Sequence, residues 1–193
     1  RAEEVLESAG LPAAELIARD GKRASDVISR MRALVRKAGS EKEQLNIHQA
    51  IEEMVHLTED EALRKGVVLR TELAADLPFV LGDRVQLQQV LLNLIINGVE
   101  AMSSVADGRR DLLVYSRLHE SKQVLIGVQD FGVGIESENL KKIFDPFYTT
   151  KSQGMGMGLA ISRSIVENHG GKLWASRNDG PGATFQFTIL SYD

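Results

Sequence analysis

Residues 154–159 read GMGMGL, and this stretch decides the fold because three alternate glycines lead directly into a helix predicted over 157–168. The N–H groups of such a loop and the N-terminus of the helix form a natural cradle for phosphate groups. A Rossmann dinucleotide site would instead follow a first strand immediately, within a βαβ unit. Here the glycines follow FYTTKS at 147–152, which is typical of a loop, so the context excludes that interpretation. Lys151 of this loop could reach phosphates as a compact charge, or could be a solvated lysine.

The helix predicted over 84–102 carries a polar stripe on an otherwise apolar surface. Its members recur at spacings of three and four, which places them on one helix face: Gln86, Gln89, Asn93, Asn97 and Glu100. A solvent-facing edge is the alternative, but such an edge more usually carries Lys, Glu or Arg, and Asn has poor helix propensity. Amide oxygens one turn apart, as at Asn93 and Asn97, suit a hard divalent cation such as magnesium beside substrate phosphates.

A third motif, DFGVG at 130–134, comes directly after a strand in which Val124, Ile126 and Val128 alternate. Asp130 therefore lies where a buried strand turns into a glycine-rich loop, and glycines permit close approach of the backbone to a ligand. A buried carboxylate is costly unless it is paired, and the exocyclic amine of adenine is a fitting donor for it. A simple Asx turn is the alternative.

The remaining pattern predicts an α/β two-layer sandwich. Asn46 with Gln49 resembles a capping box that opens a helix ended by Gly66, and Asp83 with Gln86 opens the helix over 84–102. Strands are predicted over 67–73, 112–118, 123–130, 172–177 and 183–190. Because the late strands follow one another closely, we expect an antiparallel or mixed sheet covered by helices on one side.

The N-terminal segment is predicted to be a separate helical unit. In a helix over 13–37, Ala24, Val27, Met31 and Leu34 form an apolar stripe of the kind found in coiled coils and helical bundles. Residues before it could end a preceding helix, and residues 38–44 form the expected linker. The predicted organisation is a partial helical hairpin at 1–39 followed by a domain at 45–193.

Composition excludes several classes of protein. Hydrophobic residues make up 43% and charged residues 26%, which is ordinary for a globular protein, and the net charge of −4 gives no basic footprint for nucleic acid. The absence of cysteine excludes disulfides and a thiolate nucleophile. No apolar run is long enough to span a bilayer, so we expect a cytoplasmic segment without membrane contact. Because the first residue is Arg1, we expect it to come from a longer protein, which could be membrane-anchored.

Together and in this order, the motifs resemble the catalytic, ATP-binding domain of two-component sensor histidine kinases, which belong to the GHKL superfamily and have the Bergerat fold. The resemblance covers about residues 45–190. NLIINGVEAM at 93–102 resembles the N box, DFGVGI at 130–135 the first glycine box, and IFDPFYTTK at 143–151 the F box. GMGMGLAIS at 154–162 resembles the second glycine box, and GPGATFQF at 180–187 resembles the final glycine and threonine motif.

The resemblance implies a role for each matched residue. Asn97, helped by Asn93, would bind magnesium, and Asp130 would bind the adenine amine of ATP. The other nucleotide-binding residues would be Gly132, Gly134 and Thr184 around adenine, and Lys151, Gly154, Gly156, Gly158 and Leu159 around the phosphates. Segment 136–157 corresponds to a mobile ATP lid, which Phe144 and Phe147 would anchor by packing. Gly98 departs mildly from the family, because alanine is common at that position.

The larger departure concerns the histidine that the family phosphorylates, which lies on the first helix of a dimerising hairpin and is usually followed by an acidic residue. The four histidines of this chain lack that context: His48, His56, His119 and His169. We therefore expect no phosphoacceptor histidine in this chain. Segment 13–37 resembles the second hairpin helix, which implies homodimerisation of the intact protein and a response regulator receiver domain as partner.

Three functions follow from these features. The first is the ATP-binding portion of a histidine kinase, which transfers the γ-phosphoryl group of ATP to a histidine outside this segment. The second is a nucleotide-dependent binding module without phosphotransfer. The third is a GHKL ATPase of the chaperone or topoisomerase type, which would need a carboxylate to activate water where Asn93 stands.

Overall fold

The computed structural model describes residues 42–103, 105, 110–120, 122–151 and 154–192. The predicted hairpin fragment at 1–39, with its helix over 13–37, lies outside the described residues. In chain order, the described elements are β1 (Glu43–Leu45), α2 (Ile47–Arg64), β2 (Val68–Leu73), β3 (Val80–Gly82), α3 (Arg84–Ser103), β4 (Asp111–His119), β5 (Gln123–Gln129), η1 (Lys142–Phe144), α4 (Gly158–Asn168), β6 (Leu173–Arg177) and β7 (Ala183–Leu190).

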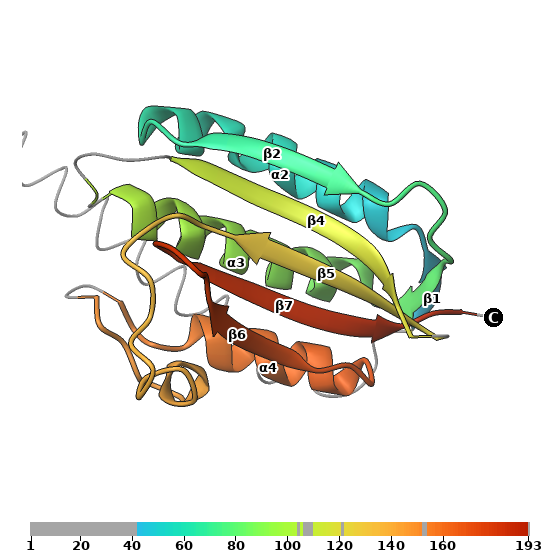
Figure 1. Cartoon of the computed structure of the whole chain (residues 1–193). Helices are drawn as coiled ribbons and strands as arrows, with labels where there is room; N and C mark the ends of the chain where they lie inside the picture. The colour runs from blue at the N-terminus through green and yellow to red at the C-terminus, as the bar shows by residue number, and fades with distance from the viewer. Residues whose placement is uncertain (1–41, 104, 106–109, 121, 152–153, 193) are drawn as a thin grey trace, which may run out of the picture. The chain divides into compact units, whose positions relative to one another are not determined.

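Five strands form one mixed sheet in the order β2-β4-β5-β7-β6. Strands β2 and β4 run parallel, whereas the other neighbours pair antiparallel. Helices α2, α3 and α4 cover one face of this sheet (Figure 1). The predicted two-layer α/β sandwich with a mixed sheet is therefore confirmed.

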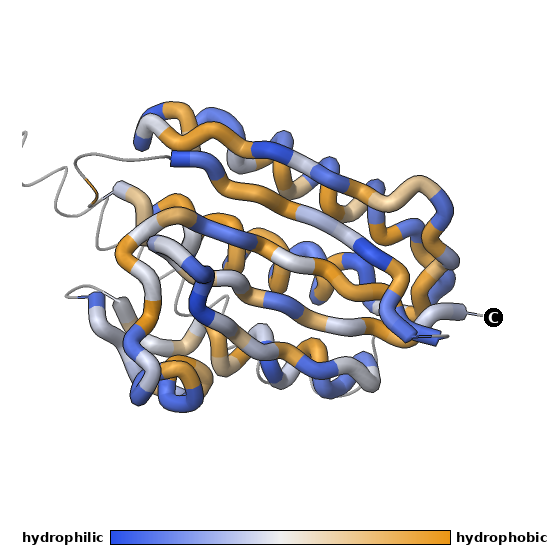
Figure 2. Tube along the Cα trace, in the orientation of Figure 1, coloured by the Kyte–Doolittle hydropathy of each residue, from blue (hydrophilic) through white to orange (hydrophobic). Residues whose placement is uncertain are grey.

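The core lies between the sheet and its helices. The apolar side chains of β7 are buried, with Phe187 and Ile189 fully covered and Phe185 only 7% exposed. In Figure 2, β7 accordingly alternates between hydrophobic and more hydrophilic residues along its length. The register of β7 against β5 sets Phe187 beside Ile126, so neighbouring strands contribute to the same apolar layer.

Helix α2 begins and ends where capping signals predict. The Asn46 side chain accepts a hydrogen bond of 2.9 Å from the His48 N–H, which satisfies one of the free donors at the helix start. Gly66 has a φ of +68° directly after the last turn, a backbone angle that glycine adopts without strain. In the last turn of α2, Ala62 occupies the inward position and is buried, whereas Leu63 is 75% exposed.

Helix α3 is the central helix of the domain and carries the predicted polar stripe. Its first turn is capped by Asp83, whose Oδ1 accepts hydrogen bonds from the N–H groups of Val85 at 2.9 Å and Gln86 at 3.2 Å. Gly98 lies where a Cβ atom would approach Leu112 Cδ1 to 2.3 Å. Glycine therefore allows β4 to pack closely against α3, which explains the departure from alanine at this position.

A small two-stranded ribbon was not predicted. Strands β1 and β3 pair antiparallel, and Val80 also bridges to Ser191 near the end of the described chain. The expected linker at 38–44 is therefore wrong at its end, where β1 begins at Glu43. Among the described residues, no helix is sufficiently long and apolar to cross a membrane.

Candidate functional site

Asp130 follows the end of β5 and is only 3% exposed. Its Oδ1 accepts one hydrogen bond from the Gly132 N–H at 2.8 Å and another from the Ala183 N–H at 3.4 Å. Burial raises the pKa of the Asp130 carboxyl above its ordinary value, and these two backbone donors oppose that rise only in part. The prediction of a buried acid at the turn from strand to glycine loop is thus confirmed.

A second layer of hydrogen bonds fixes the backbone around Asp130. The Asn178 side-chain amide donates to the Asp130 carbonyl oxygen at 2.8 Å and to the Pro181 carbonyl oxygen at 2.9 Å. The Thr184 hydroxyl donates to Asn178 Oδ1 at 2.7 Å. Thr184, which was expected near the adenine, is therefore joined to Asp130 through Asn178. Sequence reasoning missed Asn178, although an Asn in a turn with Gly and Pro commonly bonds nearby backbone groups.

The glycines of the first loop allow backbone segments to meet. A Cβ atom at position 132 would lie 2.6 Å from the backbone of Ala101, so this loop lies against the end of α3. Gly134 has a φ of +74°, and a Cβ atom there would lie 3.1 Å from the Gly182 carbonyl oxygen. The loop after β5, the end of α3 and the turn before β7 therefore form one compact corner. Gly132 and Gly134 are the residues that permit these close approaches.

Asn93 joins α3 to the start of α4. Its Nδ2 donates to Ser162 Oγ at 3.0 Å, and a Cβ atom at Gly158 would approach its Oδ1 to 2.4 Å. Gly158 therefore permits a close approach between the two helices that any larger residue would prevent. No side chain caps the N-terminus of α4, where Gly158 and Leu159 are the first two residues, and the N–H groups of such a terminus favour an anion.

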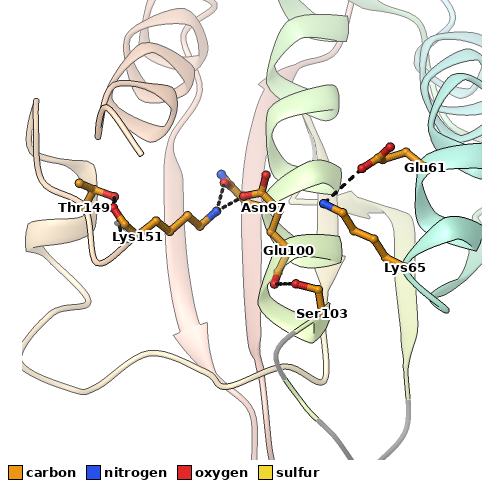
Figure 3. A network of polar contacts seen from close by, with 7 residues as sticks. All are labelled: Glu61, Lys65, Asn97, Glu100, Ser103, Thr149 and Lys151. Atoms are coloured by element: carbon orange, nitrogen blue, oxygen red, sulfur yellow. Dashed lines mark hydrogen bonds and ion pairs between the residues drawn. The ribbon is translucent and has the colours of Figure 1, made fainter. Parts of the chain in front are cut away.

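Asn97 and Glu100 lie on the same face of α3 and contact the loop before α4 (Figure 3). The Lys151 ammonium group donates to Asn97 Oδ1 at 2.9 Å and forms an ion pair with the Glu100 carboxylate. The structure thus brings Lys151 to the predicted metal-binding stripe. Glu100 belongs to that stripe but has no predicted role, although its spacing of three from Asn97 indicates that the two side chains are neighbours on the helix surface.

Gly154 and Gly156, the other two glycines of the second glycine box, shape the described part of segment 136–157, the expected lid. The Gly154 N–H donates to the Lys151 carbonyl oxygen at 3.1 Å, and the Phe147 N–H donates to the Gly156 carbonyl oxygen at 3.0 Å. Phe144 is 7% exposed, which confirms its packing. The anchoring role of Phe147 is wrong, because its left-handed backbone at φ +67° leaves the ring 75% exposed.

These residues define a site with two chemically different ends. One end offers a buried carboxylate in a backbone corner, which can accept a hydrogen bond from a heterocyclic amine. The other end offers the amide oxygen of Asn97, the carboxylate of Glu100 and the N-terminus of α4, which together suit a metal ion and phosphate groups.

The comparisons with known proteins agree with this description. The family model of histidine kinase-, DNA gyrase B- and HSP90-like ATPases matches residues 82–192. The sensor protein FixL of Bradyrhizobium diazoefficiens is 42% identical over 171 residues, which cover 89% of this chain and 34% of the relative. The sensor protein TdiS of Thauera aromatica is 35% identical over 97% of this chain and likewise 34% of its own length. The chain therefore spans about a third of the length of these curated relatives.

Solved structures give the same result. The catalytic domain of the histidine kinase ThkA is 33% identical, with a TM-score of 0.69 over 79% of this chain and 97% of that domain. Because the family model matches more than half of the chain, the protein belongs to the histidine kinase-, DNA gyrase B- and HSP90-like ATPases. Its sequence relatives within this family are sensor kinases of two-component systems.

Proposed function

We propose that this chain is the ATP-binding catalytic portion of a sensor histidine kinase, which transfers the γ-phosphoryl group of ATP to a histidine for onward transfer to an aspartate of a response regulator. The observation that carries the proposal is the buried Asp130 carboxylate, held in a backbone corner against the C-terminal part of α3. A carboxylate placed in this way can accept a further hydrogen bond beside the two from the backbone, and the exocyclic amine of adenine can donate one.

The adenine would be bound by Asp130 within the corner formed by Gly132, Gly134 and Thr184. Both backbone donors to Asp130 use the same oxygen, Oδ1. We assign the other carboxylate oxygen to the adenine amine. The Asn178 bridge would hold that oxygen in place, because it ties the Asp130 backbone carbonyl to the Thr184 hydroxyl on β7.

The residues at the other end of the site fit a magnesium ion and a triphosphate. Asn97, with Asn93, would hold the magnesium ion, whose chemistry here is to neutralise the charge of the phosphates. Gly154, Gly156, Gly158, Leu159 and Lys151 would surround the phosphates, with the N-terminus of α4 as the anion-binding element. These residues position the reacting phosphate, which is the main contribution of protein groups to phosphoryl transfer.

The phosphoacceptor histidine would come from outside the residues described above. His169 is buried, and its two ring nitrogens are hydrogen-bonded to Ile165 O at 2.7 Å and to the Asp83 N–H at 3.0 Å. His48 is bonded to Ser116 Oγ at 3.1 Å, and His56 pairs with Glu59 at 3.2 Å. We propose that the predicted hairpin of the intact protein dimerises and supplies the acceptor histidine.

A response regulator receiver domain is the proposed partner. A solved complex of ThkA with the response regulator protein TrrA includes a chain that is 26% identical to this one, with a TM-score of 0.75 over 92% of this chain and 50% of that one. An ATPase that activates water is disfavoured, because Asn93 is an amide and its Nδ2 is bonded to Ser162. The alternative of a pure binding module is separated from the kinase by the following experiment.

The proposal is tested by ATP binding in calorimetry together with phosphotransfer from radiolabelled ATP. Asp130→Ala is expected to abolish ATP binding, whereas Asn97→Ala is expected mainly to remove its magnesium dependence. Label is expected to appear on an added hairpin that carries a histidine, and not on this chain alone. Unchanged affinity in Asp130→Ala would refute the adenine assignment, and ATP binding without any label on the hairpin would favour the binding module.

A further inference from the structure

Lys151 contacts two oxygen-bearing side chains that lie one turn apart on α3. Its Nζ donates to Asn97 Oδ1 at 2.9 Å and pairs with the Glu100 carboxylate (Figure 3). Asn97 is the residue assigned to magnesium above, so the ammonium group is hydrogen-bonded to an oxygen that the metal would use as a ligand. Glu100 carries no assignment from the sequence motifs, yet it holds the same positive charge.

The oxygens of Asn97 and Glu100 form a suitable pair for a cation. Positions three apart on a helix are neighbours on its surface, so the two side chains reach the same point. Amide and carboxylate oxygens are acceptors for an ammonium group and are also the ligands that divalent cations such as magnesium prefer. Asn93 bonds Ser162 through its Nδ2, whereas Glu100 shares the Lys151 ammonium group with Asn97, so Glu100 is a further oxygen donor that the structure brings together with Asn97.

The contact with Lys151 is accessible enough to be exchanged. The side chains of Lys151 and Glu100 are 45% and 38% exposed. An ion pair at this degree of exposure contributes little to stability, because water screens the charges and ordering two long side chains costs entropy. A doubly charged ion that also binds phosphate oxygens interacts more strongly with the same carboxylate.

We propose that Asn97 and Glu100 form a cation-binding pair for which the Lys151 ammonium group and a divalent metal ion compete. Glu100 is then a ligand of the metal, directly or through a bound water, and metal binding releases Lys151 from α3. The loop that carries Lys151 is thereby freed from the helix, and the ammonium group becomes available to the phosphates. This inference rests on the proposed ATP-binding function and adds Glu100 to it.

The test compares the affinity of the full chain for ATP with and without magnesium, measured by calorimetry in millimolar magnesium and in a chelator. The measured quantity is the ratio of the two affinities. In Glu100→Gln the ratio is expected to fall about tenfold, because a charged ligand becomes a neutral one. In Lys151→Met the magnesium concentration that gives half of the metal's effect on ATP affinity is expected to fall severalfold, because the competing cation is gone.

The matched control is Glu61→Gln on α2. Glu61 pairs with Lys65 at 3.2 Å and with Arg64 at 2.5 Å, and the Glu61 and Lys65 side chains are 37% and 30% exposed, close to the values for the Glu100 pair. This variant removes a carboxylate from a similar surface ion pair and is expected to leave the ratio unchanged. Thermal unfolding of each variant shows whether it is folded, and the half-exposed positions make a loss of fold unexpected.

An unchanged ratio in Glu100→Gln would overturn the inference, as would an unchanged or raised magnesium midpoint in Lys151→Met, since Lys151 would then not compete with the metal. If Glu100→Gln changed the affinity for ATP equally with and without magnesium, Glu100 would only hold Lys151 and would not bind the metal. That result would also overturn the inference. In each of these cases ATP still binds and the proposed function stands. Loss of ATP binding by the unaltered chain would remove both.

Discussion

The two ends of the candidate site are built in different ways. At the adenine end, Asp130 and Thr184 are 3% and 8% exposed, and Asn178 joins the backbone of one to the hydroxyl of the other. At the cation end, Lys151 and Glu100 are about half-exposed and meet only through their side chains. The first end is part of the core, whereas the second lies on the surface of α3.

This difference decides what a substitution at each end can do. Buried hydrogen-bonded groups cost free energy when one partner is lost, so changes at the adenine end act on folding and on ligand binding together. Exposed ion pairs contribute little to folding. Changes at the cation end should therefore act on ligand binding alone, and a residue there is free to exchange one partner for another.

The largest effect is expected for Gly182→Ala, which attacks the buried end directly. Gly182 has a φ of +90°, and a Cβ atom there would lie 2.0 Å from the Asp130 carbonyl oxygen. Backbone strain and this clash should together lower the free energy of unfolding by about 3 kcal/mol or more, measured by urea denaturation.

Gly180→Ala is the matched control, because it lies in the same turn and no atom lies within 4 Å of its Cβ position. Its effect is expected to stay within about 0.5 kcal/mol. If both variants were equally stable, the turn before β7 would be less tightly bound to Asp130 than the contacts indicate, and the contrast between the two ends would fail.

The next effect is a pH dependence that belongs to the buried end alone. Burial raises the pKa of Asp130 above its ordinary value of 3.8, so the folded protein binds this proton at a higher pH than the unfolded chain does. Acid therefore does not destabilise the fold through Asp130, but it removes the carboxylate that accepts the adenine amine. Below the raised pKa, ATP affinity should fall by up to about tenfold per pH unit.

Calorimetry with ATP between neutral pH and the onset of unfolding measures this fall. Purine riboside triphosphate is the control ligand, because it has a hydrogen atom in place of the exocyclic amine and no ring N–H beside it, so it cannot donate a hydrogen bond to the carboxylate. An equal loss of affinity for both nucleotides would show that some other group titrates, and the assignment of Asp130 to the amine would lose its support.

Much of the adenine end follows from local sequence. A strand that alternates Val124, Ile126 and Val128, followed by an acid and glycines, predicts a buried carboxylate at a loop, because both signals lie within a dozen residues. The capping residues Asn46 and Asp83 and the helix-ending Gly66 are local signals of the same kind, and the structure confirms all three.

The features that were missed depend on residues far apart in the chain. Strands β1 and β3 have three residues each, which is too short for a periodic pattern, and they pair only because the fold brings them together. The Lys151 contact with Glu100 joins residues 51 positions apart. The outward Phe147 depends on a left-handed backbone that is uncommon for an aromatic residue, so the packing that the family resemblance implied for this residue does not occur.

The smallest effect is expected for the exposed ion pair of the cation end, which should contribute almost nothing to folding. Glu100→Gln and Lys151→Met should each change the free energy of unfolding by less than about 1 kcal/mol, because the pair is exposed and screened. Glu61→Gln should behave in the same way, and urea denaturation of the three variants measures it. A loss well above that of the Glu61 control would mean that Lys151 holds the loop to α3 as part of the fold. The loop could then not exchange its cation at low cost, and the cation end would resemble the adenine end after all.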